Sequence, residues 1–143
     1  MRCEPMTAED LDSLPPCPAG TDLWLFDGEP VERWNGAVFH SPGHAGAVAA
    51  ISALLGRWCH GRDEYQAFGY GCPYRLAANP DTLLSFDVSV VRRAHDGGPI
   101  EYPTFVDGVP VLGVEVIELD EDPDLLQRMV GAALRCGVGT VWL

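Results

Sequence analysis

Apolar residues recur along this chain with two different spacings, which predict its helices and strands. Spacings of three and four residues give one apolar stripe between residues 47 and 58 and a second between 125 and 134. Ser41-Pro42 and Asp122-Pro123 precede these stripes, as they often precede helices, and a glycine follows each stripe. The pattern therefore predicts two long helices.

Runs of β-branched and apolar residues predict the strands. Residues 83–91 and 111–117 are the clearest runs, and residues 65–76 are strand-like although glycine and proline interrupt them. Residues 138–143 begin a last strand. Near the N-terminus, Asp27-Gly28 separates two short runs, and this dipeptide suits a hairpin turn because both residues tolerate positive φ.

The predicted order is a short helix after Thr7, a hairpin, a helix, three strands, a helix and a strand. This order predicts an α/β or α+β domain with a central mixed sheet flanked by helices. A length of 143 residues favours a single domain over residues 1–143. Residues 94–108, which are rich in glycine and proline, are expected to be irregular.

Composition narrows the class of protein. A hydrophobic content of 47% favours a globular fold. No apolar run approaches the ~20 residues that cross a bilayer, so no membrane partner is expected. The N-terminus lacks the basic and apolar segments of a secretory signal. The five cysteines are scattered without a CxxC pair, which argues against structural zinc and favours reduced thiols in a cytoplasmic protein.

Charge argues against simple nucleic-acid binding. The formal net charge is −12, and all nine basic residues are arginine, so the chain contains no lysine. Nucleic-acid binders usually present a basic face. DNA is therefore disfavoured as a partner unless the arginines cluster or cations intervene.

Two acidic residues interrupt the two clearest strands. Alternation along residues 83–91 places Asp87 on the face opposite to four apolar side chains, which are Leu84, Phe86, Val88 and Val90. Alternation along residues 111–117 places Glu115 opposite Leu112, Val114 and Val116. If the two strands are neighbours in the sheet, Asp87 and Glu115 meet on one face.

A buried carboxylate costs several kcal/mol unless something compensates its charge. One divalent cation compensates two carboxylates at once, and Mg²⁺ suits oxygen ligands of this kind. The pair therefore predicts a magnesium site. The alternative is that each acid faces solvent or pairs with an arginine.

Several short motifs, in order, resemble those of the Uma-type restriction endonucleases, a bacterial branch of the PD-(D/E)XK nuclease superfamily. Leu25-Phe26-Asp27-Gly28-Glu29 resembles the family's LIDGE hairpin, and Ser41-Pro42-Gly43-His44 resembles its SPxH helix entry. Phe86-Asp87-Val88-Ser89-Val90-Val91 stands where the family has PDxxxV. Val114-Glu115-Val116-Ile117 stands where it has VEVLS, and Gly137-Val138 with Val141-Trp142-Leu143 resembles GVxxYWLV.

The resemblance implies a restriction-endonuclease-like core and hydrolysis of DNA phosphodiester bonds with Mg²⁺ or Mn²⁺. It implies Asp87 and Glu115 as metal ligands and catalytic residues, with the Val116 carbonyl as a third oxygen. Many nucleases of the superfamily act as dimers, so a homodimer is one assembly that the resemblance allows.

This chain also departs from the family. Ile117 occupies the lysine position of the motif, and the family's alternative lysine on the following helix corresponds to Met129. Gln127 and Arg128 are adjacent substitutes: glutamine can orient a water, whereas guanidinium is a poor general base. His44 could contact a phosphate or assist proton transfer, or simply pack. Arg92 could face a phosphate backbone, or end a solvated strand.

Two hypotheses follow. The first is a magnesium-dependent DNA endonuclease. The second is a catalytically inactive module of the nuclease fold that binds protein or nucleic acid. The absence of lysine, the net acidity and Met129 favour the second hypothesis.

Overall fold

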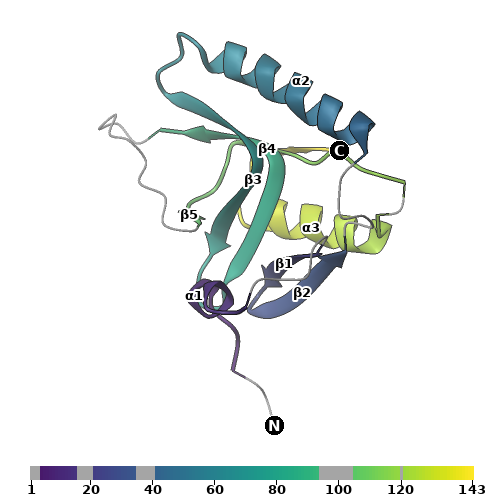
Figure 1. The fold of residues 1–143 in the computed structure, drawn as a ribbon. Coiled ribbons are helices and arrows are strands. Elements are labelled where there is room, and N and C mark those ends of the chain that lie inside the picture. Colours follow the sequence, from purple (N-terminus) through teal and green to yellow (C-terminus); the bar gives the residue numbers. More distant parts are fainter. Residues whose placement is uncertain (1–3, 16–20, 35–40, 94–104, 120) are drawn as a thin grey trace.

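The computed structural model describes residues 4–15, 21–34, 41–93, 105–119 and 121–143 (Figure 1). Within those ranges no helix is long and apolar enough to span a membrane. The elements in chain order are α1 (Ala8–Asp12), β1 (Thr21–Phe26), β2 (Glu29–Trp34), α2 (Pro42–Cys59), β3 (Tyr65–Ala77), β4 (Thr82–Arg92), β5 (Val106–Asp107), β6 (Leu112–Val114), α3 (Pro123–Arg135) and β7 (Thr140–Trp142).

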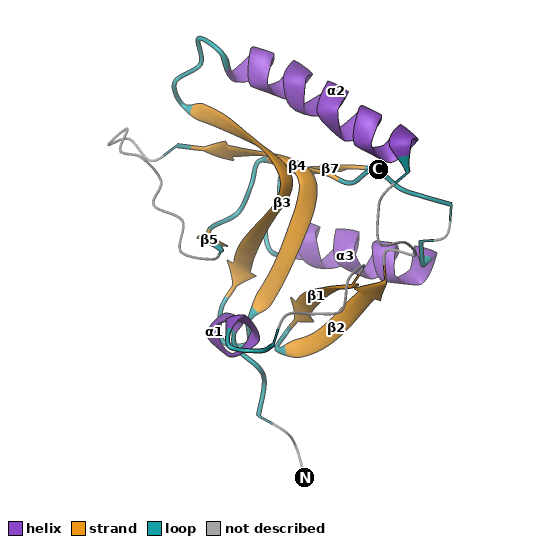
Figure 2. Ribbon diagram, in the orientation of Figure 1, coloured by secondary structure: helices purple, strands orange, loops and turns teal. Residues whose placement is uncertain are grey.

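The described strands form one sheet in which β2, β1, β4, β3 and β5 are successive neighbours, and β6 joins β4 to β7. The pairs β3–β5 and β6–β7 are parallel, and the others are antiparallel. Figure 2 shows α2 and α3 on opposite sides of the β4, β6 and β7 strands. The prediction of a central mixed sheet flanked by helices, with an N-terminal hairpin, is confirmed.

The local signals in the sequence place the ends of the elements correctly. Asp27 and Gly28 both have positive φ, of 53° and 79°, as the predicted hairpin turn requires. Ser41 caps α2 by accepting the amide N–H of His44, and Asp122 caps α3. These signals work because each involves only neighbouring residues.

Alternation along β4 differs from the prediction. The register between β3 and β4 shifts between Gly69, which pairs with Val88, and Cys72, which pairs with Phe86. The bulge in β3 therefore lies opposite Asp87. Phe86 packs in the apolar cluster that includes α3, whereas Val88 packs with α2. The prediction that Phe86 and Val88 share a face is wrong, because the bulge interrupts the alternation of β4.

Two further expectations need correction. The predicted strand over residues 111–117 ends at Val114, where the chain turns away from β4. The apolar stripe of α2 is only partly buried: Val48 packs on Val88, but Trp58 remains 44% exposed. Of the irregular stretch, residues 94–104 lie outside the described residues, and the unpredicted short strand β5 follows them.

Close packing at Gly113 gives a direct test of the sheet. A Cβ atom at this position would lie 2.6 Å from the Phe86 ring, whereas a Cβ atom at Gly56 on α2 would have no neighbour within 4 Å. We expect Gly113→Ala to destabilise the protein by about 1–3 kcal/mol through overpacking. Gly56→Ala should leave stability unchanged or raise it by up to ~1 kcal/mol. Urea denaturation measures both, and equal stabilities would contradict the described β4–β6 packing.

Candidate metal and catalytic site

Asp87 is held at the point where β4 faces the bulge of β3. Its side chain is buried, with 7% relative exposure. Its Oδ2 accepts the amide N–H of Val116 at 2.8 Å and lies 3.2 Å from His44 Nε2. Oδ1 makes no hydrogen bond or ion pair to any described residue. Asp87 is therefore fixed through one oxygen and keeps the other available.

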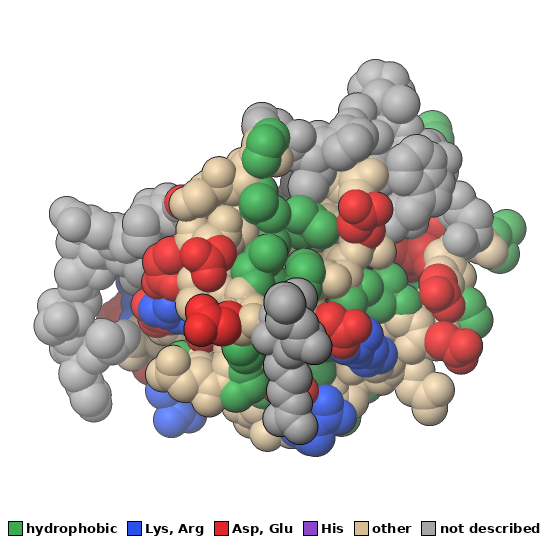
Figure 3. All heavy atoms as spheres, turned by 90° about the horizontal axis from the view of Figure 1, so that it is seen from below, with side chains coloured by type: hydrophobic (Ala, Val, Ile, Leu, Met, Phe, Trp, Pro, Cys, Tyr) green, Lys and Arg blue, Asp and Glu red, His purple; other side chains and the backbone are tan. Residues whose placement is uncertain are grey.

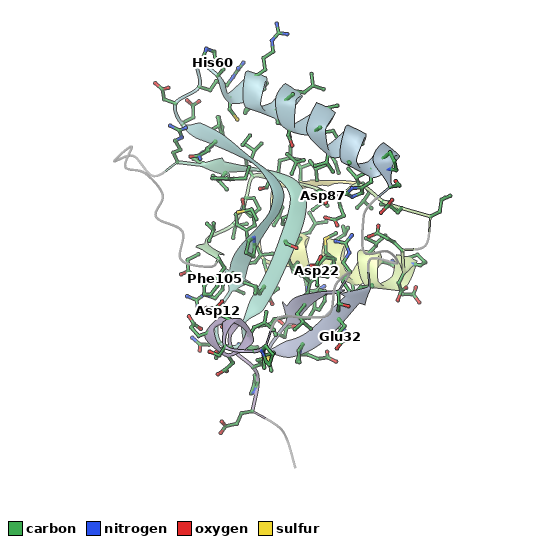
Figure 4. All side chains as sticks on the ribbon, in the orientation of Figure 1. Asp12, Asp22, Glu32, His60, Asp87 and Phe105 are labelled. Carbon is green, nitrogen blue, oxygen red and sulfur yellow. The ribbon has the colours of Figure 1, made fainter. Side chains whose placement is uncertain are left out.

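His44 comes from the first turn of α2, which Ser41 caps. The imidazole is buried, at 5% exposure, although the sequence pattern alone left both packing and function open for it. Figure 4 shows Asp87 beneath the N-terminal end of α2. The helix start thus delivers a titratable ring nitrogen to the carboxylate of Asp87.

Glu115 follows β6 directly. The register pairs Val88 with Val114, so Asp87 and Glu115 would face each other at the next step of the ladder. Glu115 instead donates its amide N–H to the Trp142 carbonyl of β7, at 3.0 Å. The Glu115 side chain is 1% exposed. The register of β4 and β6 and the effect of the Asp87 charge on Glu115 place the two acids near each other, with Glu115 one residue beyond the end of β6.

Arg33 of β2 is the cation beside Glu115. Its guanidinium forms ion pairs with Glu115 Oε1 and Glu121 Oε1, and it lies 4.8 Å from the centroid of the Trp24 ring. Apart from the ion pair with Arg33, the two oxygens of Glu115 accept no hydrogen bond of normal geometry from the described residues. Sequence reasoning assigned Arg33 no role at the site. The one signal in the sequence was spacing: Arg33 lies two residues after the apolar Val31, so the two side chains share one face of β2.

Burial dominates the electrostatics of this cluster. Desolvation raises the pKa of Glu115 to about 8, although the charge of Arg33 opposes the change; Asp87 and Glu121 add to it. Burial alone would lower the pKa of Arg33, but the charges of Glu115 and Glu121 outweigh burial and raise it. The raised pKa values favour the charged form of Arg33 and the neutral form of Glu115. One guanidinium, that of Arg33, pairs with both Glu115 and Glu121. Asp87 adds a further negative charge near Glu115, which favours the neutral form of Glu115.

A cavity of about 230 Å³ adjoins the cluster. Its lining includes Trp24, Arg33, Glu121 and Leu126, and it extends along Glu32 at the hairpin. The cavity gives solvent a route to the guanidinium of Arg33.

The remaining predicted site residues lie in different places. Val116 contributes its amide N–H to Asp87. Arg128 pairs with Glu29 and lies over the Phe26 ring, at 4.3 Å, so its described contacts are with the hairpin. Gln127 is exposed on α3. Arg92 lies at the far end of β4, beside Tyr65.

Met129 stands at the position that corresponds to the family lysine. It is fully buried in the apolar cluster of α3 and the sheet. This side chain fills the core and has no charge to offer the two acids.

The donor atoms of Asp87 and Glu115 suit a hard, oxygen-binding cation. Oδ1 of Asp87 and Oε2 of Glu115 have no partner among the described residues, and both acids are buried. In the described ranges no group of three or more His, Cys, Asp or Glu side chains is arranged around a metal position. Mg²⁺ takes one or two carboxylates and completes its shell with water, backbone carbonyls or phosphate, and Asp87 and Glu115 would supply the two carboxylates.

The mixed, mostly antiparallel sheet with its flanking helices is a fold that another solved structure shares. A solved structure of similar fold comes from Anabaena variabilis ATCC 29413 and is described as "a putative nuclease belonging to DUF820". The TM-score is 0.70 at 16% identity, over 97% of this chain and 73% of that one. At this identity the likeness shows the fold. No family model matches the sequence, and no curated protein matches it.

The raised pKa of Glu115 predicts a pH-dependent stability. The folded state holds a proton that the unfolded state releases between about pH 4.5 and 8, so the free energy of unfolding should fall as pH rises through this window. A pKa difference of one between the folded and unfolded states corresponds to about 1.4 kcal/mol, so the fall amounts to a few kcal/mol. We expect Glu115→Gln to flatten this slope.

Urea denaturation at several pH values measures the effect, in buffer without divalent metal. Glu29→Gln, which removes an exposed carboxylate from the hairpin, is the matched control and should keep the slope of the wild type. Because the two variants differ only in which carboxylate is removed, the comparison isolates Glu115. Identical slopes in wild type and Glu115→Gln would contradict the prediction.

Proposed function

We propose that this protein is a magnesium-dependent DNA endonuclease of the Uma type, in which Asp87 and Glu115 hold the metal ion. The observation that supports the proposal is the burial of Glu115 and Asp87 near each other, where the only described cation paired with Glu115 is Arg33, which Glu121 shares. A protein gains little from two acids at this depth unless a cation joins them. The nuclease-like fold supports the choice of reaction.

Each residue of the cluster then has a distinct part. The Val116 amide fixes Oδ2 of Asp87, which leaves Oδ1 toward the ion, and the Val116 carbonyl is proposed as a further oxygen ligand. A bound Mg²⁺ would polarise the scissile phosphate and lower the pKa of an attacking water. Arg33 pairs with both Glu115 and Glu121, so its pairing with Glu121 would be kept if Glu115 held the ion.

Proton handling falls to His44. Its Nε2 lies 3.2 Å from Asp87 and can exchange a proton at the edge of the site. Gln127 or Arg128 would have to approach from α3 to orient a water or a phosphate, and Arg128 would have to leave Glu29 to do so. The lysine of the family pattern has no direct replacement among the described contacts.

The test is cleavage of a supercoiled plasmid with Mg²⁺ or Mn²⁺. We expect wild-type protein to nick the plasmid and Asp87→Ala to lower the rate at least about 100-fold, the scale of ~2.7 kcal/mol of transition-state stabilisation. Asp124→Ala, which removes an exposed acid from the first turn of α3, is the control for charge. Equal residual cleavage by wild type and Asp87→Ala would contradict the proposal.

A second candidate is an inactive binding module of the same fold. The pairing of Arg33 with Glu115 favours it, because a built-in guanidinium already neutralises one acid of the pair. This candidate predicts no specific binding of Mg²⁺ or Mn²⁺ in calorimetry. Tight Mn²⁺ binding that Glu115→Ala abolishes would count against it.

A further inference from the structure

Arginines on this acidic chain fall into two groups. Arg33, Arg75 and Arg128 all form ion pairs with carboxylates. The other five arginines in the described ranges form none, and four of the five gather where α2 ends and where β3 and β4 meet. Those four are Arg57, Arg62, Arg92 and Arg93, and we call them the arginine end of the molecule.

Aromatic rings, rather than acids, hold two of these arginines. The guanidinium of Arg62 lies 4.7 Å from the centroid of the Trp58 ring, and that of Arg92 lies 5.7 Å from the Tyr65 centroid. The Trp58 and Tyr65 rings themselves lie 5.1 Å apart. Each guanidinium also donates one local hydrogen bond, from Arg62 to the Trp58 carbonyl at 2.5 Å and from Arg92 to the Tyr65 hydroxyl at 3.4 Å. Because stacking uses the face of the group, the remaining N–H donors lie at its edge for other acceptors.

The surface at this end is shaped as well as charged. A hollow of about 320 Å³ has His60, Arg62, Tyr65 and Arg93 in its lining. Two acids, Asp63 and Glu64, lie in the same turn, so the four arginines outnumber the acids locally in a chain of net charge −12. The opposite end differs: Figure 3 shows acidic side chains spread over the face that carries α1.

We infer that the arginine end is a docking surface for the phosphate backbone of a nucleic acid. Arginine matches phosphate oxygens through its planar fork of donors, and the aromatic rings hold that fork in position before the ligand arrives. The choice of nucleic acid over other polyanions rests on the proposed function. The docking itself requires neither the metal site nor catalysis.

The position of this surface suits a substrate that also reaches the two carboxylates. Figure 4 shows His60 and Asp87 at opposite ends of α2. The 18 residues of α2 span about 27 Å, which corresponds to about eight base pairs of duplex. A duplex anchored at the arginine end can therefore extend to the acids, although the acidic residues around Glu121 repel it elsewhere.

Fluorescence anisotropy with labelled 20-mer oligonucleotides in EDTA tests the inference at low and at moderate salt. We expect Arg62→Gln/Arg93→Gln to weaken binding at least about tenfold at low salt and to reduce the salt slope by about two, one for each lost phosphate contact. Arg135→Gln, which removes an exposed charge from α3, is the control and should change binding less than about twofold. Single-stranded and duplex arms show which form binds.

Circular dichroism confirms that each variant is folded, and Arg57→Gln/Arg92→Gln is a second variant of the same surface. Equal weakening by the surface variants and the α3 control would overturn the inference, as would wild-type protein that binds neither oligonucleotide. If wild-type protein binds the oligonucleotides but does not cleave plasmid, the nuclease proposal alone is overturned. If wild-type protein cleaves plasmid but the surface variants bind as well as wild type, this inference alone is overturned.

Discussion

The burial of Glu115 is the constraint on which the candidate site depends. A carboxylate with 1% exposure loses nearly all of its hydration, and the fold supplies one guanidinium shared with Glu121 in return. Three distant segments have to meet for this to happen: β2 brings Arg33, the end of β6 brings Glu115, and β7 accepts the Glu115 amide. A mixed sheet is the arrangement that brings these segments together.

The bulge opposite Asp87 completes the arrangement. It interrupts the alternation of β4, so that Phe86 packs in the cluster that includes α3 whereas Val88, two residues later, packs with α2. Bulges of this kind re-aim a side chain without ending the strand. Asp87 thereby sits between the two helix layers, where both His44 and the Val116 amide reach its carboxylate.

Sequence reasoning succeeded where the signal was local and failed where it depended on another strand. The hairpin turn at Asp27-Gly28 and the caps of α2 and α3 each require only adjacent residues, and they were predicted correctly. The two strand-like runs that hold Asp87 and lead to Glu115 were also predicted, and β4 and β6 are neighbours in the sheet. The bulge lies in β3, and the sequence of β4 contains no sign of it.

The pairing of Arg33 with Glu115 was missed for the same reason. These residues are far apart in the sequence, and no local pattern connects them. The missing lysine, in contrast, has a structural explanation that the sequence only suggested. Met129 faces the core and packs there, so the helix position that corresponds to the family lysine serves stability in this chain. Any catalytic cycle has to proceed without a lysine at that position.

The central claim is that Asp87 and Glu115 share a cation. A crystal grown with Mn²⁺ and measured at the manganese absorption edge tests it most directly. The account predicts an anomalous peak within about 2.0–2.3 Å of one oxygen from each acid, with Arg33 paired to Glu121 alone. A fully ordered site without a peak, in which Arg33 still bridges Glu115 and Glu121, would contradict it.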